Sequence, residues 1–207
     1  GEHLVQMLNE RTGFGRERID DAAREGKGLA RAGTCRDKQL DFQNQAIRVK
    51  VSDQNICFND RLQGQHCANL QHDLGDFVLK RRDGIINYQL AVVVDDYLQE
   101  ISHVVRGADL LDNTERQIWL GQLLGYPALE YMHLPLAMNH LGQKLSKQNL
   151  AQALDLKHAP ELLLQAIIAL GQAPVDLDQP DLMLAQAVAQ WDISRIPQGT
   201  TLQSIYQ

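Results

Sequence analysis

The chain has 207 residues, 44% of them hydrophobic, and its 20 basic and 26 acidic residues give a net charge of −6. This length suits one moderate domain, or one domain with an appendage. No apolar run is long enough to cross a membrane and no signal-peptide pattern is visible, so we expect a cytoplasmic protein that does not enter a membrane. The acidic balance argues against a general nucleic-acid coat, although a local basic patch can still bind a tRNA.

The charge is unevenly distributed along the chain. Arg16–Lys50 holds nine basic and six acidic residues, whereas Leu150–Gln207 holds two basic and six acidic ones. A patch that faces phosphates and ordinary surface variation explain this pattern equally well.

The first segment, Gly1–Arg11, has apolar residues near helical spacing but no N-cap, and it reads as the continuation of an earlier segment. The cysteines Cys35, Cys57 and Cys67 form no C-x-x-C pair. An odd number of cysteines without a secretory signal favours reduced thiols in a cytosolic protein.

Strands are predicted next. Ala46–Val51 alternates apolar and charged residues, which indicates a half-exposed strand, and Asn55–Leu62 indicates a strand and turn. Asp73–Lys80 is predicted as a strand that runs into a basic turn. In Ile85–Tyr97 the three valines favour a strand, while the spacing from Tyr88 onward is compatible with one face of a helix.

The following segment predicts a strand, a helix and a second strand. Ile101–Arg106 is predicted as a short buried strand, Glu115–Gly125 as a helix with an apolar face, and Glu130–Met138 as a strand in which Pro135 marks the end or an edge position. A loop follows. This order is how nucleotide sites are built in open parallel α/β sheets.

Two amphipathic helices are predicted near the end of the chain. Ala159–Ala169 has Pro160 at its start and Gly171 as its stop, and Pro180–Trp191 follows. Together they enclose a small bundle.

The loop between these parts, Leu134–Asn149, reads LPLAMNHLGQKLSKQN. It places Lys144 and Lys147 around a serine. Flexible backbone with clustered ammonium groups suits a triphosphate, because lysine can follow the phosphates as charge moves in a transition state. By itself, a K-x-x-K pattern fits a solvated surface loop better than a phosphate site.

Four elements in order strengthen the phosphate interpretation. They are RRDGIINYQLAVVVDD, RGADLL followed by TERQ, YMHLPL, and KLSKQ. The set resembles the glutamyl branch of the class I aminoacyl-tRNA synthetases and, within it, the small subfamily of glutamyl-queuosine tRNA(Asp) synthetases. The resemblance implies an α/β fold, namely the second half of a Rossmann-type catalytic domain with a small C-terminal helical extension. It also favours a helix from Tyr88.

The resemblance divides the chain into three parts. Residues 1–72 would be a partial connective region with a degenerate zinc subdomain. Residues 73–149 would be the C-terminal half of the catalytic domain with the KLSK loop, and residues 150–207 the helical extension.

The resemblance also implies roles for individual residues. Lys147 is predicted to contact the phosphates of ATP, and Lys144, Leu145, Ser146 and Gln148 complete the KLSK motif. Arg106 is predicted to bind a carboxylate of L-glutamate bidentately, and the Tyr88 hydroxyl to orient the same substrate.

Each of these residues has a structural alternative. Arg106 could form an ion pair with Asp109, and Tyr88 could be a core residue. His133 could line the adenine pocket or be an exposed structural histidine. Asp95 and Asp96 fit a solvated helix end better than a metal site.

Zinc is not expected. The family's zinc subdomain has a C-x-C, a tyrosine and a further cysteine before an arginine, and only the last element is present here, at Cys35. One thiolate cannot hold tetrahedral zinc, so Cys35 is a lone remnant or a buried thiol. The only cofactor expected is ATP, with Mg²⁺.

The function implied is ATP-dependent activation of L-glutamate and its transfer to the queuosine base of tRNA(Asp). About sixty residues follow KLSK, so the catalytic body itself would hold the anticodon arm. No His-Ile-Gly-His-type signature precedes Tyr88. This suggests a missing N-terminal half, and the chain would associate either with that half or with a second copy of itself. Two alternatives remain: a non-catalytic module that binds tRNA or a protein, and a core fragment of an ordinary glutamyl-tRNA synthetase.

Overall fold

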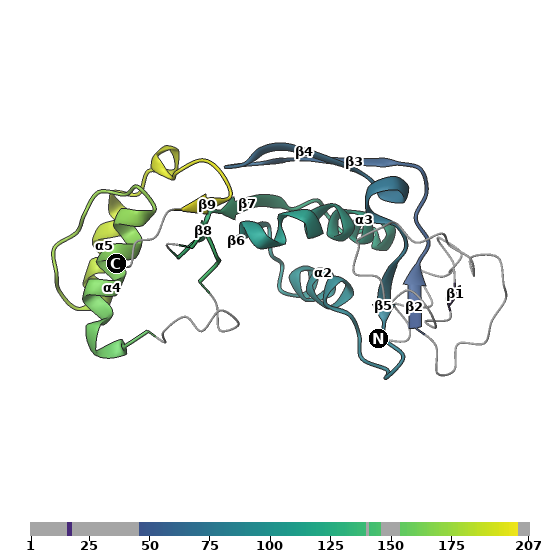
Figure 1. Ribbon diagram of the computed structural model, residues 1–207, viewed down its shortest axis with the longest axis horizontal. Coiled ribbons are helices and arrows are strands. Elements are labelled where there is room, and N and C mark those ends of the chain that lie inside the picture. The colour runs from purple at the N-terminus through teal and green to yellow at the C-terminus, as the bar shows by residue number, and fades with distance from the viewer. Residues whose placement is uncertain (1–15, 18–45, 140, 146–153, 203–207) are drawn as a thin grey trace. The chain divides into compact units, whose positions relative to one another are not determined.

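The computed structural model describes residues 16–17, 46–139, 141–145 and 154–202 (Figure 1). The chain divides into two compact units that interleave along the sequence. Unit 1 comprises the described residues within Gly1–Asp60, Gly64–Val104 and Leu111–Tyr131, and unit 2 those within Arg61–Gln63, Val105–Leu110 and Met132–Gln207. Each unit is considered by itself below.

Unit 1 contains a three-stranded antiparallel sheet with β2 (Ala46–Val49) between β1 (Arg16–Glu17) and β5 (Phe77–Lys80). The strand predicted at Ala46–Val51 is confirmed, but its predicted half-exposure is wrong, since all four residues of β2 are buried. Arg48 is only 8% exposed, and its Nη1 donates to the Asp76 carbonyl at 3.0 Å. A charged residue in an alternating pattern therefore need not mark a solvent-facing side.

A hairpin of β3 (Asn55–Asp60) and β4 (Gly64–Asn69) follows, and its register places Cys57 opposite Cys67. The two cysteines form a disulfide. The prediction of reduced thiols is therefore wrong for this pair. Ten residues separate them in the sequence, and only the hairpin register shows that they face each other.

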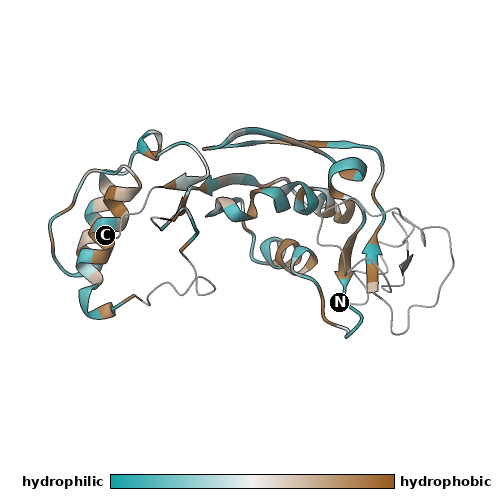
Figure 2. Ribbon diagram, in the orientation of Figure 1, coloured by the Kyte–Doolittle hydropathy of each residue, from teal (hydrophilic) through white to brown (hydrophobic). Residues whose placement is uncertain are grey.

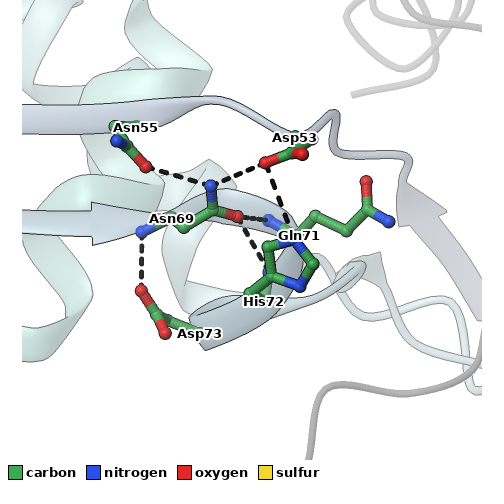
Figure 3. Close-up of polar contacts among 6 residues, drawn as sticks. All are labelled: Asp53, Asn55, Asn69, Gln71, His72 and Asp73. Carbon is green, nitrogen blue, oxygen red and sulfur yellow. Dashed lines mark hydrogen bonds and ion pairs between the residues drawn. The ribbon is translucent and has the colours of Figure 1, made fainter.

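One amide side chain joins the base of this hairpin to η1 (Leu70–Leu74), a short π-helix (Figure 3). Asn69 Oδ1 accepts from the backbone N–H groups of Gln71 and His72, while its Nδ2 donates to Asp53 and Asn55. Asp73 Oδ2 accepts from the Asn69 N–H at 2.7 Å. The predicted strand Asp73–Lys80 therefore starts too early: Asp73 caps a turn and β5 begins at Phe77.

The helix predicted from Tyr88 is confirmed as α2 (Tyr88–Leu98), and the next as α3 (Thr114–Leu124), which follows the 3₁₀ segment η2 (Ala108–Asn113). Both helices pack on the strands of unit 1. The resulting core contains the buried residues Val49, Val51, Ile56, Leu70, Phe77, Leu79, Leu90, Val93, Leu120 and Leu124. Burial against this core explains why the valines of α2 take helical form, since tertiary packing overrides local propensity.

Strands β6 (His103–Gly107) and β7 (Glu130–Leu134) pair with each other. The Glu130 N–H donates to the Ser102 carbonyl at 3.0 Å, so the two strands lie with their amino ends side by side. This is the parallel arrangement that a strand–helix–strand connection favours. The prediction that the first strand is buried is wrong, because its residues alternate in exposure and Val105 is 55% exposed.

Pro135 ends β7, as predicted, and the short β8 (Leu136–Ala137) then pairs in parallel with β9 (Thr201–Leu202). The helices predicted for this part are confirmed as α4 (Ala159–Ala169) and α5 (Pro180–Ala189), flanked by η4 (Leu156–His158) and η5 (Ile193–Arg195).

The α4–α5 pair has a small core of Ile167, Val175, Met183 and Ala187. Apolar and polar residues mix along both helices (Figure 2). Gly171, the predicted stop of α4, has φ +71° and lies so close to the Arg195 carbonyl that a Cβ would meet it at 2.1 Å. Among the residues that the structure describes, no helix is long and apolar enough to span a membrane.

Candidate active site

Arg106, near the carboxyl end of β6, is held by two contacts in unit 2. Its Nε donates to His133 Nε2 at 2.9 Å, and its Nη2 donates to the Leu110 carbonyl at 3.4 Å. These contacts fix one edge of the guanidinium. A guanidinium with a fixed plane is suited to recognise a carboxylate, because its paired N–H groups match the two carboxylate oxygens.

His133 lies on β7 and is fully buried. The alternative of an exposed histidine is therefore wrong. Because a guanidinium can only donate, the Nε2 atom of His133 must accept, and the ring is neutral with its proton on Nδ1. His133 thus acts on Arg106 directly, a role that the sequence pattern did not indicate, since 27 residues separate the two.

Gln63 holds the backbone of the same region. Its Nε2 donates to the His133 carbonyl at 2.8 Å and to the Gly199 carbonyl at 2.9 Å. The residue belongs to the turn between β3 and β4, 70 positions from His133, so no local pattern could have identified it. It fixes the strand that carries the histidine.

Gly107 follows Arg106 and allows a close approach by the side chain of Asp109. A Cβ at this position would meet Asp109 Oδ1 at 2.6 Å and Leu136 Cδ2 at 3.0 Å. This crowding explains the Arg-Gly pair physically: a larger residue would push Asp109 away.

Asp109 Oδ2 accepts a hydrogen bond from Lys144 Nζ, and the two side chains form an ion pair. The pKa of Asp109 lies below its usual value, mainly because of this hydrogen bond and also because of the charges of Lys144 and Arg106. Both side chains are about two-fifths exposed, so the pair contributes little to folding stability. The ion pair holds the first lysine of the KLSK motif against the segment that follows β6.

The approach to the KLSK loop is a tight turn. The Asn139 N–H donates to the Gln143 carbonyl, and Asn139 Oδ1 accepts from the N–H groups of Leu141 and Gln143. Leu145 N–H then donates to the Ala137 carbonyl at 3.0 Å. Lys144 and Leu145 are therefore placed by backbone contacts, while Ser146, Lys147 and Gln148 lie outside the described residues.

Tyr88 is the first residue of α2, in unit 1, and is 46% exposed. This exposure rules out the alternative of a core residue. The neighbouring Gln89 contacts α3, because its Nε2 donates to Asn113 Oδ1 and its Oε1 accepts from Gln117 Nε2. The start of α2 is thereby fixed, with the tyrosine accessible to a ligand.

The prediction that the chain binds no zinc is not tested by the described residues. Cys35 lies outside the described residues. Within the described part of the chain, no group of three or more His, Cys, Asp or Glu side chains could hold a metal ion.

Comparison with known families defines the class of protein. Residues 2–193 match the catalytic domain of the class I tRNA synthetases of the E and Q type, and the chain belongs to this family. Two solved structures share the fold. The glutamate-tRNA synthetase of Elizabethkingia anophelis matches with a TM-score of 0.72 and 20% identity, over 98% of this chain and 50% of that one. The glutamate tRNA ligase of Elizabethkingia meningosepticum in complex with its amino acid matches with a TM-score of 0.61 and 24% identity, over 77% of this chain and 36% of that one. The predicted family and the α/β fold are confirmed.

Individual relatives show which members of this family the chain resembles in sequence. A protein of Acinetobacter baylyi named glutamyl-Q tRNA(Asp) synthetase is 69% identical over 181 residues, which are 87% of this chain and 62% of that protein. A protein of the same name from Neisseria meningitidis (strain FAM18) is 47% identical over 176 residues, 82% of this chain and 59% of that protein. The chain thus spans about three-fifths of the length of these curated relatives.

Proposed function

We propose that this chain is part of an enzyme that activates L-glutamate with ATP and transfers it to the queuosine base of tRNA(Asp). The observation that carries the proposal is the 69% identity, over 87% of the chain, to a relative that is named for this activity. The contact between Arg106 and His133 supports it, because it presents a rigid cation where a substrate carboxylate would bind.

In the first step, an oxygen of the glutamate α-carboxylate attacks the α-phosphorus of ATP. The bond between the α-phosphorus and the bridging oxygen breaks, and pyrophosphate leaves from a glutamyl-adenylate. The charge that builds on the leaving group must be stabilised, which is the role proposed for Lys147 with Mg²⁺. In the second step the queuosine base takes the glutamyl group and AMP leaves.

The proposal assigns the substrate contacts to a few residues. Arg106 binds a carboxylate of glutamate, with His133 holding the guanidinium in its plane. Tyr88 orients the amino acid through its hydroxyl. Asp109 holds Lys144, and so the start of the loop that carries Lys147. The anticodon arm of tRNA(Asp) is the proposed macromolecular partner.

The decisive experiment is glutamate-dependent exchange between ATP and pyrophosphate in the absence of tRNA. It is measured on this chain and on a longer version that adds the part of the curated relatives' length that this chain does not cover. Exchange in the longer protein, followed by transfer of labelled glutamate to queuosine-containing tRNA(Asp), is the expected result. Transfer to tRNA(Glu) instead would favour an ordinary glutamyl-tRNA synthetase, and no exchange in either protein would overturn the proposal.

Substitutions in the longer protein test the roles. Arg106→Ala should raise the KM for glutamate by about 10- to 100-fold, because a charge-assisted pair contributes roughly 1.5–3 kcal/mol. Arg106→Lys is the matched control: it keeps the charge but loses the bidentate geometry, so it should recover only part of the affinity. Lys147→Ala should lower the exchange rate more than it weakens glutamate binding. An unchanged KM in Arg106→Ala would refute the assignment of this residue.

A further inference from the structure

A cavity of about 510 Å³ lies within unit 1, and none of the candidate site residues lines it. Its walls come from β3, α2 and α3, from the residues just before β6, and from the segment that leads into β7 together with the start of that strand. In open parallel sheets the substrates of the main reaction bind at the carboxyl ends of the strands. This cavity is built at the amino ends, and its volume falls in the range of roughly 300–1,000 Å³ that is typical of small-molecule pockets.

Four aromatic side chains, Phe58, Tyr97, Tyr126 and Tyr131, line the cavity. Tyr97 and Tyr126 stack face to face, with ring centroids 3.8 Å apart and planes 2° from parallel. Phe58 and Tyr131 meet edge to face at 5.6 Å. Ring faces carry a negative quadrupole and attract a cation that lies over them. An apolar or aromatic body with a positive charge therefore matches these walls.

Among the described residues that line the cavity, the charged side chains have one sign. Asp96 and Glu100 contribute carboxylates, and the other polar groups, Ser102, Gln117 and Gln122, are neutral. No lysine or arginine occurs among the described residues that line it. An anion, such as a nucleotide or a nucleic-acid phosphate, would be repelled, whereas a cation would be attracted.

We propose that this cavity binds a small organic cation that carries an aromatic ring. The ring packs among the tyrosines, and the ammonium group faces Glu100. This ligand class differs from glutamate, ATP and tRNA, which are all anionic, so the inference stands apart from the proposed function and its failure would leave that proposal intact.

A series of three probes with one ring and three charges tests the proposal. Phenethylamine, 2-phenylethanol and phenylacetate are titrated against the intact chain at pH 7 and followed by ligand-observed NMR. Phenethylamine should bind about fivefold more tightly than the alcohol, as expected for one partly exposed charge pair, and phenylacetate should bind most weakly. Equal binding of amine and acid, or no binding of the amine at millimolar concentration, would overturn the proposal.

Gly121, on α3, allows the cavity to be filled without a clash. It lines the cavity, and a Cβ built there would meet no atom within 4 Å. Gly121→Leu, which also improves helix propensity, should extend from this open position into the cavity and abolish binding of phenethylamine. Gly121→Ala, which leaves most of the volume free, is the matched control and should retain binding. Unchanged affinity in Gly121→Leu would place the probe elsewhere and refute the site.

Glu100→Gln tests the charge separately from the shape. It keeps the size of the side chain and should reduce the preference for the amine over the alcohol to about half or less, while binding of the alcohol stays unchanged. Glu161→Gln, an exposed carboxylate on α4 that does not line the cavity, is the control for net charge. A preference that persists in Glu100→Gln but falls in Glu161→Gln would refute local recognition.

Discussion

The two units differ in what holds them together. Among the described residues, unit 1 has a continuous apolar core of ten buried residues. The helical part of unit 2 has an apolar cluster of four residues. Amide side chains also hold backbone segments of unit 2, since the buried Gln172 and the half-buried Gln63 both donate to backbone carbonyls.

Because of this difference, the residues that stabilise the fold and the residues proposed to bind substrate are largely separate sets. Removing apolar volume should unfold unit 1, whereas the proposed catalytic groups of unit 2, Arg106, Asp109 and Lys144, are polar and half-exposed or exposed. A site made of such groups can be altered with little effect on folding, because its side chains bury little apolar surface. Substitutions can test how far this separation holds.

The largest effect is expected for Leu120→Ala in unit 1. Leu120 is fully buried in the core, and its truncation removes apolar contacts and leaves a cavity. The free energy of unfolding should fall by about 2–5 kcal/mol, measured by urea denaturation. Leu98→Ala, at a position of α2 that is 70% exposed, is the control and should cost well under about 1 kcal/mol. Similar losses of unfolding free energy in both variants would contradict the assignment of Leu120 to the core.

A smaller effect, of a different kind, is expected for Gln172→Ala in unit 2. Gln172 is 4% exposed; its Nε2 donates to the carbonyls of Leu170 and Asp192, and its Oε1 accepts from the Asp192 N–H. Truncation leaves these backbone groups unpaired and should cost about 1–3 kcal/mol. Hydrogen exchange should accelerate around α4 and the following segment while α3 stays protected. Equal acceleration in α3 would show that the units unfold together.

Glu115→Gln should stabilise the chain at neutral pH, by on the order of 1 kcal/mol. Glu115 is 6% exposed with an unpaired Oε2, and desolvation raises its pKa above the usual 4.5, with a further contribution from Asp112. A carboxyl group whose pKa is raised by folding stabilises the folded state fully when the pH is below its pKa in the unfolded chain. This stabilisation is lost as the pH rises through its pKa in the folded chain.

The gain from Glu115→Gln should therefore be present at pH 7 and disappear below about pH 4.5. Thermal unfolding across this range measures it. Asp112→Asn, an exposed neighbour, is the matched control and should show a smaller gain. Destabilisation by Glu115→Gln at pH 7 would mean that the carboxylate has a favourable partner.

The smallest effect is expected for Asp109→Asn. Because its pKa is lowered by Lys144, Asp109 stabilises the fold above its ordinary pKa of about 3.8, and this contribution is lost as the pH falls through the folded value. The pair is about two-fifths exposed, so screening keeps the loss at pH 7 well under about 1 kcal/mol. The same variant in the longer protein should lower the exchange rate, since the start of the KLSK loop is released. A large loss of stability would contradict the separation between the units.

Much of the fold could be predicted from local patterns. The helix Ala159–Ala169 was predicted with its observed bounds, because Pro160 favours the first turn and Gly171 ends it. The order of the Arg-Gly, His-x-Pro-Leu and KLSK elements identified the family, which the match over residues 2–193 confirms. The predicted roles of Tyr88, Arg106 and Lys147 stay predictions.

Errors arose where burial decides the structure. Arg48 looked like a solvent-facing residue, yet its guanidinium reaches the Asp76 carbonyl from a buried strand. Cys57 and Cys67 looked like separate thiols, although they are directly opposite in a hairpin. A period of two places residues on faces but does not say which face packs against another element.

The sequence by itself determined the order of the main elements and the family, since helix starts and stops and motif order depend on neighbouring residues. Only the tertiary structure decided which distant groups meet: Arg106 with His133, Gln63 with the backbone of β7, and Phe58 with Tyr131 in the cavity wall. These contacts join residues tens of positions apart. Their geometry depends on strand register and helix packing, which result from burial of the whole core and which no local pattern encodes.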